Sequence, residues 1–260
     1  MLQPASEVGL NNLKHLVPKR LRRWLNLRRQ AARRGLLVFD RVTDWSVLRR
    51  VHPYRPDFGV ARGGPIDRFY IEKFLATYQQ GICGRVAEIE NDQYTRQFGG
   101  GRVEHSDILD LNEQNERRTM TLDLTQTSSV PADAFDCIIC TQTLLLIEDY
   151  NAAVRSLYKM LRSEGVLLVT VPGICQIVRG GMIGGVGEDW WRFTGRSAKR
   201  IFSNIFAPEN VVVLTYGNVL SATAFLHGLV QAELTQEELE FNDPDYEVTI
   251  GVKAVKRGAR

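Results

Sequence analysis

The chain has 260 residues, of which 44% are hydrophobic and 24% charged, and its formal net charge is +3. These proportions exclude a disordered or fibrous chain and predict one globular domain with additions, or at most two domains. No stretch approaches the roughly 20 consecutive apolar residues that cross a bilayer, and we identify no secretory signal, so we expect a cytoplasmic protein.

The positive charge is concentrated near the N-terminus. Nine Lys and Arg residues, and no acid, lie between Glu7 and Asp40. Apolar residues interleave with these bases at a spacing close to one helical face: Leu21, Trp24, Leu25 and Leu27. We therefore predict a basic helical extension and arm over residues 1–60, followed by the main domain at 61–260.

Three interpretations of the basic residues 14–34 stay open. A helix of this kind can lie on an anionic membrane or against a membrane-bound glycosyltransferase, in which case the protein would be peripheral at the inner face of the membrane. It can also pack with its bases in solvent, or bind nucleic acid. No basic patch with interleaved aromatic residues occurs elsewhere, so we expect no nucleic-acid partner.

Helices and strands alternate from Pro65 onward. Pro65 suits the first turn of a helix, and apolar residues then recur along one face until Gly81. The pattern after Gly81 predicts, in order, a strand at 85–89, a helix at about 93–98, strands at 102–105, 118–122 and 135–140, a helix at about 150–162, a strand at 166–171, a helix at about 196–204, a strand at 210–214, a helix at 219–233 and a strand at 246–255. This alternation predicts a parallel sheet with helices on both faces, and the last strand is expected beside the sixth, in antiparallel orientation.

Acidic residues recur at or near the ends of the predicted strands. Glu88 lies at the end of the first strand, Asp107 follows the second, Asp123 follows the third, and Asp136 lies at the start of the fourth. Open α/β sheets bind ligands outside the carboxyl ends of their strands. We therefore expect a nucleoside-like ligand at this edge.

The four cysteines do not make a disulfide framework in a chain of this length. Cys137 and Cys140 have the spacing of a metal or redox pair, but they lie in a predicted buried strand. Residues three apart on a strand point to opposite faces, so we interpret both as small buried core residues. No other cluster has metal-ligand spacing, and we predict no metal.

Several segments together resemble a class I S-adenosylmethionine-dependent methyltransferase. The order of the elements, the acid near the end of the first strand and the segments at residues 121–124 (TLDL), 135–144 (FDCIICTQTL), 161–172 (LRSEGVLLVTVP) and 191–194 (WRFT) contribute to this resemblance. Residues 64–71 (GPIDRFYI) and 216–220 (YGNVL) resemble more narrowly the bacterial small-molecule and sugar methyltransferases associated with glycosyltransferases. The resemblance covers about residues 60–255 and implies a Rossmann-like, seven-stranded, mostly parallel sheet with an antiparallel last strand.

The resemblance also implies a cofactor, S-adenosylmethionine, and residues that bind it. Glu88 matches the acid of the first motif, Asp107 the acid that binds the ribose hydroxyls, and Asp123 the acid that accepts the adenine amino hydrogen. The implied cofactor-binding residues are Glu88, Ile89, Glu90, Asp107, Asp123, Leu124, Thr141 and Gln142. A strand-end acid can instead hold a turn or cap a helix, and this alternative stays open for Asp107 and Asp123.

The first loop departs from the family pattern. The family has three alternating glycines there, because glycine allows a tight turn and a close approach to the cofactor. In this chain Glu90, Asp92 and Tyr94 occupy those places. A binding or scaffold protein of glycan assembly, with a degenerate methyltransferase fold, is therefore the alternative to an enzyme.

The acceptor side is expected in the last third of the chain. A hydroxyl acceptor benefits from a general base, and the candidates are Asp189, His227 and Glu188. Trp190 and Trp191 could stack on a sugar, and Arg192 could neutralise an anionic group. Each also has a structural alternative, namely core packing for His227 and the tryptophans and an ion pair for Arg192.

The function that we predict from the sequence is O-methylation of a hydroxyl on a sugar or glycan precursor. A nicotinamide dehydrogenase uses the same kind of sheet but is disfavoured, because its phosphate-binding turn needs glycines below a pyrophosphate.

Overall fold

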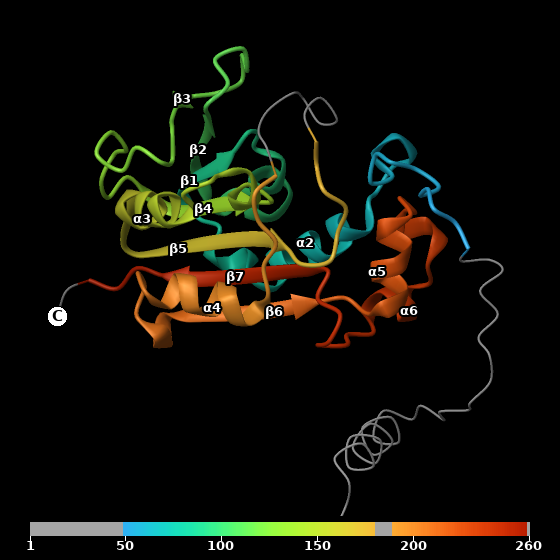
Figure 1. Cartoon of the computed structure of the whole chain (residues 1–260). Helices are drawn as coiled ribbons and strands as arrows, with labels where there is room; N and C mark the ends of the chain where they lie inside the picture. The colour runs from blue at the N-terminus through green and yellow to red at the C-terminus, as the bar shows by residue number, and fades with distance from the viewer. Residues whose placement is uncertain (1–48, 180–188, 259–260) are drawn as a thin grey trace, which may run out of the picture. The chain divides into compact units, whose positions relative to one another are not determined.

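The computed structural model describes residues 49–179 and 189–258. A seven-stranded sheet lies at its centre, in the order β3-β2-β1-β4-β5-β7-β6 (Figure 1). The strands are β1 Gly84–Ile89, β2 Val103–Asp110, β3 Met120–Thr121, β4 Phe135–Thr141, β5 Leu161–Pro172, β6 Val211–Tyr216 and β7 Thr249–Val255. The first five strands pair in parallel, and β7 pairs antiparallel with both β5 and β6.

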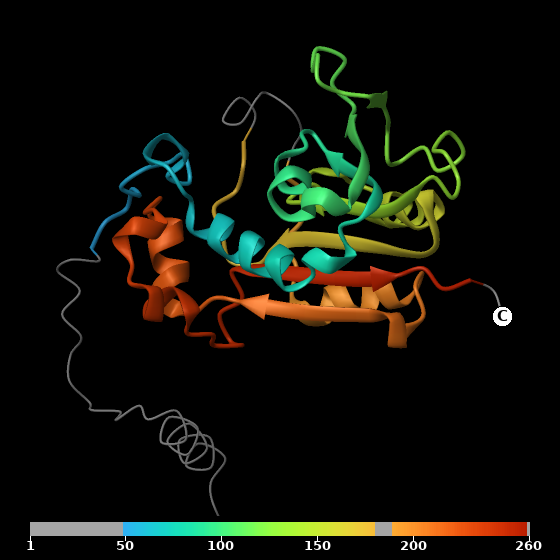
Figure 2. The same cartoon turned by 180° about the vertical axis from the view of Figure 1, so that it is seen from behind.

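Helices cover both faces of the sheet. They are α2 Ile66–Thr77, α3 Tyr150–Met160, α4 Gly195–Ser203, α5 Val219–Leu226 and α6 Gln236–Glu240. One apolar core contains residues of α3 and α4, and a second contains residues of α2 and α5. Accordingly, α3 and α4 lie in front of the sheet in Figure 1, whereas α2 lies in front of it in Figure 2. The predicted Rossmann-like fold with helices on both faces is confirmed.

The middle of β4, from Cys137 to Cys140, is apolar because both faces of the strand are covered. In β4, Cys137 and Ile139 belong to one core, whereas Ile138 and Cys140 belong to the other. Both cysteines are buried and free, so the prediction of two core thiols on opposite faces is confirmed.

Several predicted boundaries were wrong, among them the starts of the fifth strand, at Leu161, and of the last strand, at Thr249. The second strand continues to Asp110, because its pairing with β1 extends to the couple Ile89–Leu109. The third strand is only two residues long. The helix predicted at 219–233 ends at Leu226, because Gly228 adopts φ +69° and its N–H bonds to the Phe225 carbonyl, a typical helix stop.

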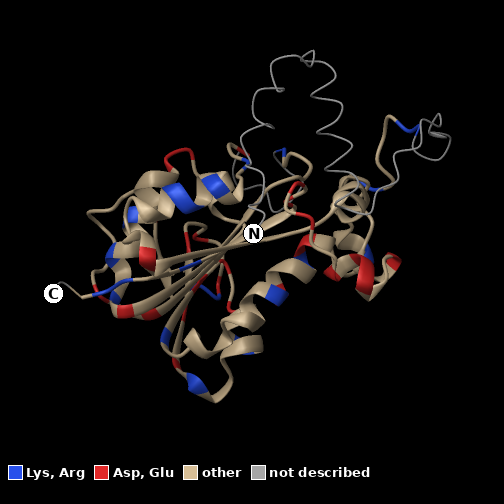
Figure 3. Cartoon of the chain, turned by 90° about the horizontal axis from the view of Figure 1, so that it is seen from below, with Lys and Arg blue, Asp and Glu red and all other residues tan. Residues whose placement is uncertain are grey.

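The C-terminal part of the sequence has an acidic stretch, in contrast to the basic stretch near the N-terminus. The stretch from Glu233 to Glu247, both included, contains seven acids and no base, and the acids of α6 are visible in Figure 3. Most of the predicted basic extension lies outside the described residues, as does Glu188. No helix among residues 49–179 and 189–258 is long and apolar enough to cross a membrane.

Candidate functional site

The edge formed by the carboxyl ends of the parallel strands has two unusual backbone positions. Glu90 follows β1 with φ +74°, and Gln142 follows the neighbouring strand β4 with φ +48°. The N–H of each continues the sheet pairing, to the Leu109 carbonyl at 2.9 Å and to the Thr170 carbonyl at 2.9 Å. Left-handed residues other than glycine cost of order 1 kcal/mol or more and cluster at functional sites. The chain therefore turns sharply at two adjacent strand ends.

Glu88 holds the loop that follows β1. Its side chain is 2% exposed, and its two carboxylate oxygens accept the N–H groups of Tyr94 at 3.1 Å and Thr95 at 2.7 Å, together with the Thr95 hydroxyl. Burial raises the pKa of Glu88, whereas the hydrogen bonds from Thr95 and Tyr94 oppose the shift. In this arrangement Glu88 shapes the loop and presents no free oxygen edge to a ligand.

The side chains at two of the three glycine places are held within the protein. Asp92 is 6% exposed and pairs with Arg96 at 2.6 Å and with Arg117. The Tyr94 hydroxyl accepts a hydrogen bond from Arg68 at 2.9 Å. The charge of Asp92 is thus compensated, so of the two acids in this loop only the exposed Glu90 is left without a partner cation in the described structure.

Asp107 does not lie at the end of β2, contrary to our expectation. It lies inside the strand, opposite Ala87, and its carboxylate accepts hydrogen bonds from Arg85 at 2.7 Å and the Thr119 hydroxyl at 3.0 Å. Burial opposes ionisation of Asp107, but these bonds more than offset it and lower the pKa. Strand residues advance about 3.3 Å each, so Asp107 lies about 10 Å below the strand end.

Asp110 occupies the end of β2 instead. It is half-buried, and its two oxygens accept hydrogen bonds from the Asn112 N–H at 2.9 Å and the Asn115 side-chain amide at 2.7 Å. Asn115 also donates to the Glu90 carbonyl at 2.8 Å, which joins the ends of β1 and β2. The signal that we missed in the sequence is the apolar pair Ile108–Leu109, which extends the strand up to this acid.

The predicted residues after β3 and β4 lie near this edge. Asp123 accepts hydrogen bonds from the Thr125 N–H and hydroxyl, each at 2.8 Å, so it also holds its own turn. Leu124 is buried. Thr141 is the last residue of β4 and Gln142 follows it, as predicted.

Asp189 is not placed to act as a general base. Its side chain is completely buried, and it accepts hydrogen bonds from both terminal nitrogens of Arg192 and from the Val178 N–H at 2.7 Å. Arg192 also donates to the Gln176 carbonyl at 2.6 Å. Because each group neutralises the other, the structural alternative for Arg192 is correct, and the pair ties together the two segments that flank residues 180–188.

The two tryptophans differ in their surroundings. The Trp191 indole N–H donates to the Ile147 carbonyl at 2.9 Å, and its ring meets Tyr150 edge-on at 5.1 Å. Trp191 therefore packs against the core, whereas Trp190 is 46% exposed and can still stack on a ligand.

His227 lies at the C-terminal end of α5. Its ring meets Tyr54 at 5.3 Å, and its carbonyl accepts the Arg55 N–H at 3.0 Å. These contacts are those of a packing residue that holds the arm at residues 54–55.

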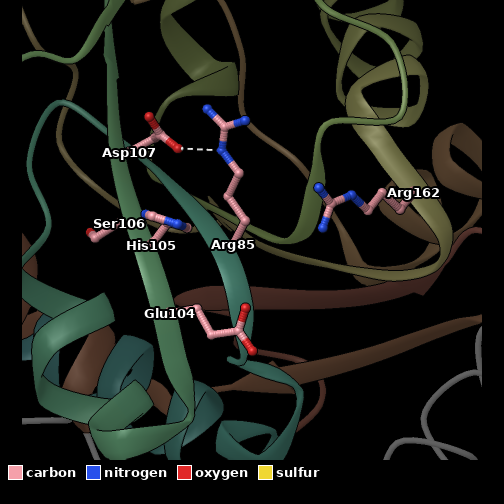
Figure 4. Close-up of a pocket in the computed structure, with 6 residues that line it drawn as sticks. All are labelled: Arg85, Glu104, His105, Ser106, Asp107 and Arg162. Carbon is pink, nitrogen blue, oxygen red and sulfur yellow. Dashed lines mark hydrogen bonds and ion pairs between the residues drawn. The ribbon is translucent and has the colours of Figure 1, made fainter.

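Of two surface hollows of similar size in the described structure, only one adjoins the carboxyl edge of the sheet. The one in Figure 4, of about 390 Å³, lies toward the amino ends of the strands and is lined by Arg85, Glu104, His105, Ser106, Asp107 and Arg162. Its arginines are already paired, with Asp107 and with Asp136. The other, of about 400 Å³, adjoins the carboxyl end of β5, and Phe193, Asp245 and Glu247 contribute to its lining. The second therefore fits the predicted site better.

No group of three or more His, Cys, Asp or Glu side chains in the described part of the chain is arranged to hold a metal ion.

Comparison with known proteins gives a family match for the centre of the chain. Residues 78–169 match the family model of a methyltransferase domain. This stretch includes Glu88, Glu90, Asp110 and Gln142, and the match indicates S-adenosylmethionine as the cofactor. No curated protein matches the chain.

Several solved structures are similar to this chain at low sequence identity. An S-adenosylmethionine-dependent methyltransferase from Archaeoglobus fulgidus is 12% identical, with 73% of this chain and 94% of that chain covered and a TM-score of 0.47. One from Mesorhizobium loti is 14% identical, with 74% and 99% covered and a TM-score of 0.47. A Burkholderia thailandensis 1,6-didemethyltoxoflavin-N1-methyltransferase, with 1,6-didemethyltoxoflavin and S-adenosylhomocysteine bound, is 11% identical, with 76% and 81% covered and a TM-score of 0.47.

Proposed function

We propose that this chain is an S-adenosylmethionine-dependent methyltransferase that methylates a hydroxyl group of a sugar or glycan precursor. The observation that supports it most is the edge at β1, β2 and β4, where Glu90 and Gln142 turn the chain sharply and Asp110 lies at the strand end within the matched stretch. When bound, the cofactor supplies an activated methyl group on a positively charged sulfur.

The residues present fit the nucleoside part of this cofactor. A carboxylate can accept two hydroxyl donors at once, and the hydrogen bonds from Asn112 and Asn115 orient Asp110 while leaving lone pairs for the ribose hydroxyls. Asp123 would accept the adenine amino group beside Leu124. Asp110 thus takes the role that we had expected for Asp107.

The hollow at the end of β5 supports a sugar acceptor. Its lining includes Phe193, Asp245 and Glu247, and aromatic residues and carboxylates suit the faces and hydroxyls of sugars. Glu247 also accepts the Gly195 N–H at 2.8 Å, which fixes its position. The exposed Trp190 offers a second ring for stacking on a ligand.

The scaffold alternative depends on the three missing glycines. The structure weakens that reason. Arginines bind the side chains of Asp92 and Tyr94, and Glu90 adopts a backbone conformation typical of glycine. An enzyme is therefore the function that the site supports best.

Calorimetric titration with S-adenosylhomocysteine tests this function. We expect micromolar binding to the wild type, weakened about tenfold or more in Asp110→Asn through loss of charged hydrogen bonds. Asp107→Asn is the matched control, since it removes an acid from the same strand about 10 Å away, and it should leave the affinity unchanged. A folded wild type that binds neither S-adenosylmethionine nor S-adenosylhomocysteine would favour the scaffold alternative.

We also propose that residues 14–34 bring the enzyme to an anionic membrane surface or a membrane-bound partner. The support is the sequence alone, with nine bases and no acid in this part of the chain. Deletion of residues 1–38 should abolish co-sedimentation with anionic vesicles at low salt, where charge attraction is strongest. Equal sedimentation of the full-length and shortened chains would refute the proposal.

A further inference from the structure

Asp67 lies in the first turn of α2, which begins at the carboxyl edge of the sheet. Tyr70, one turn further on, stacks with Tyr216, the last residue of β6, with ring centres 5.9 Å apart. Tyr216 pairs with Thr249, which pairs with Pro172 at the end of β5. The turn that contains Asp67 therefore lies at the same edge as Glu90 and Gln142.

The first turn of α2 lies against the segment after β1, because Arg68, the neighbour of Asp67, donates a hydrogen bond to the Tyr94 hydroxyl at 2.9 Å. The negative charge of Asp67 also acts on Tyr94 and on Cys175, which lies in the segment after β5. In the sheet order, β4 is the strand between β1 and β5. The two segments on which Asp67 acts therefore follow the strands that flank β4, the strand that ends at Thr141.

The carboxyl group of Asp67 is held without a partner side chain. Asp67 is half-buried, and among residues 49–179 and 189–258 no side chain donates a hydrogen bond to its carboxylate. The adjacent Arg68 donates to Tyr94 instead. Burial raises the pKa of Asp67 to about 6, against the lowering effect of Arg68. A carboxyl group of this kind is largely ionised at neutral pH and still able to take a proton.

We propose that Asp67 is the catalytic residue that accepts the proton of the acceptor hydroxyl during methyl transfer. As the hydroxyl oxygen forms its bond to the methyl carbon, its proton passes to Asp67 and the former carbon–sulfur bonding pair stays on the departing neutral thioether. Asp67 replaces Asp189 and His227 in this role, since the first is neutralised by Arg192 and the second packs against Tyr54. The inference rests on the proposed function.

The neighbouring groups described next do not change their charge near neutral pH, so the titration of Asp67 can be followed separately. Burial raises the pKa of Cys175 to about 12 and raises that of Tyr94, so both keep their protons near neutral pH. Arg192 stays charged at all pH values used, because, against the opposing effect of burial, its pKa is raised by the hydrogen bond to Asp189. Asp189 is paired with Arg192.

The affinities for S-adenosylmethionine and S-adenosylhomocysteine, measured by calorimetry between pH 5 and pH 8, test the placement without an acceptor. The two ligands share their amino, carboxylate and nucleoside groups, and only the first has a positive sulfur. If Asp67 faces the methyl group, its ionisation should increase the preference for S-adenosylmethionine by about threefold or more as pH rises through about 6.

The variant Asp67→Asn should abolish this pH dependence while still binding S-adenosylhomocysteine. Glu72→Gln removes a charge from the same helix and should retain the pH dependence. A preference that is independent of pH in the wild type, or equally dependent in Asp67→Asn, would overturn the inference and leave the proposed function intact. If the wild type binds neither ligand, both are overturned.

Discussion

The carboxylate of Asp189 and the guanidinium of Arg192 form a two-armed ion pair, and the side chain of Asp189 is completely buried. Val178 donates its N–H to the same carboxylate at 2.7 Å, and Arg192 donates to the Gln176 carbonyl at 2.6 Å. This pair therefore fixes the two chain segments that lead to the expected acceptor side.

Asp189→Asn should destabilise the protein without removing the cofactor site. The change leaves a partly buried guanidinium without its counter-charge, which costs about 2–4 kcal/mol. Urea unfolding would measure the loss. Arg257→Gln breaks the exposed pair with Glu164 and is the control, with an expected effect below about 0.5 kcal/mol. Equal effects of the two changes would contradict the structural role that we assign to Asp189.

Glu90→Gly should raise the free energy of unfolding by about 0.5–1 kcal/mol, because glycine adopts the left-handed conformation of this residue, with φ +74°, without strain. The variant should still bind S-adenosylhomocysteine. Glu164→Gly is the matched control, since Glu164 also has a left-handed conformation, with φ +65°. It should increase stability similarly and leave the affinity unchanged. A destabilised Glu90→Gly would show that the Glu90 side chain has a structural partner.

Asp67→Asn should make the protein more stable at pH 7.5. The folded state raises the pKa of Asp67 from 3.8 to about 6, so it binds the proton more tightly than the unfolded state. The free energy of unfolding therefore falls as pH rises from about 4 to about 6 and is level outside this window. Asparagine does not ionise, so we expect a gain of about 1–2 kcal/mol at pH 7.5, allowing for the partial exposure of Asp67, and none at pH 3.5. Thermal unfolding at both pH values would measure it, and an equal gain at both would be the contrary result. A residue that reduces stability at the working pH is typical of a functional site.

Gly251→Ala should destabilise the contact between β7 and α2 that positions Asp67. A methyl group at this position would lie 2.3 Å from the Phe74 ring, and overpacking of this kind costs about 1–3 kcal/mol. Gly101 has no atom within 4 Å of the corresponding position, so Gly101→Ala should change stability by less than about 0.5 kcal/mol. Chemical denaturation would compare the two, and a neutral Gly251→Ala would indicate looser packing of α2 on the sheet.

Periodicity in the sequence was sufficient to predict the sheet, because strands buried on both faces are apolar throughout and helices have one apolar stripe. It placed Cys137 and Cys140 on opposite faces and Thr141 and Gln142 at the end of β4, as the structure confirms. These properties depend on residues that are neighbours in the chain.

The residues at which the strands end could be identified only from the tertiary structure. Asp107 was expected at the edge, but pairing with β1 continues the strand to Leu109 and pairing with β3 continues it to Asp110. The end of a strand depends on the strands with which it pairs. The residue pattern of one segment contains little information about those partner strands.

The chain by itself thus determined the order of its elements, the two-faced sheet and the edge at which a ligand would bind. The tertiary structure decided which acids are available there. Arg192 neutralises Asp189, which also accepts the Val178 N–H, and Arg96 and Arg117 neutralise Asp92. The charge of Asp67 acts on the segments that follow β1 and β5, and its carboxylate has no partner side chain in the described structure. The charge state and reactivity of a carboxyl group depend on the water, cations and donors around it, and packing of segments far apart in the sequence places those groups.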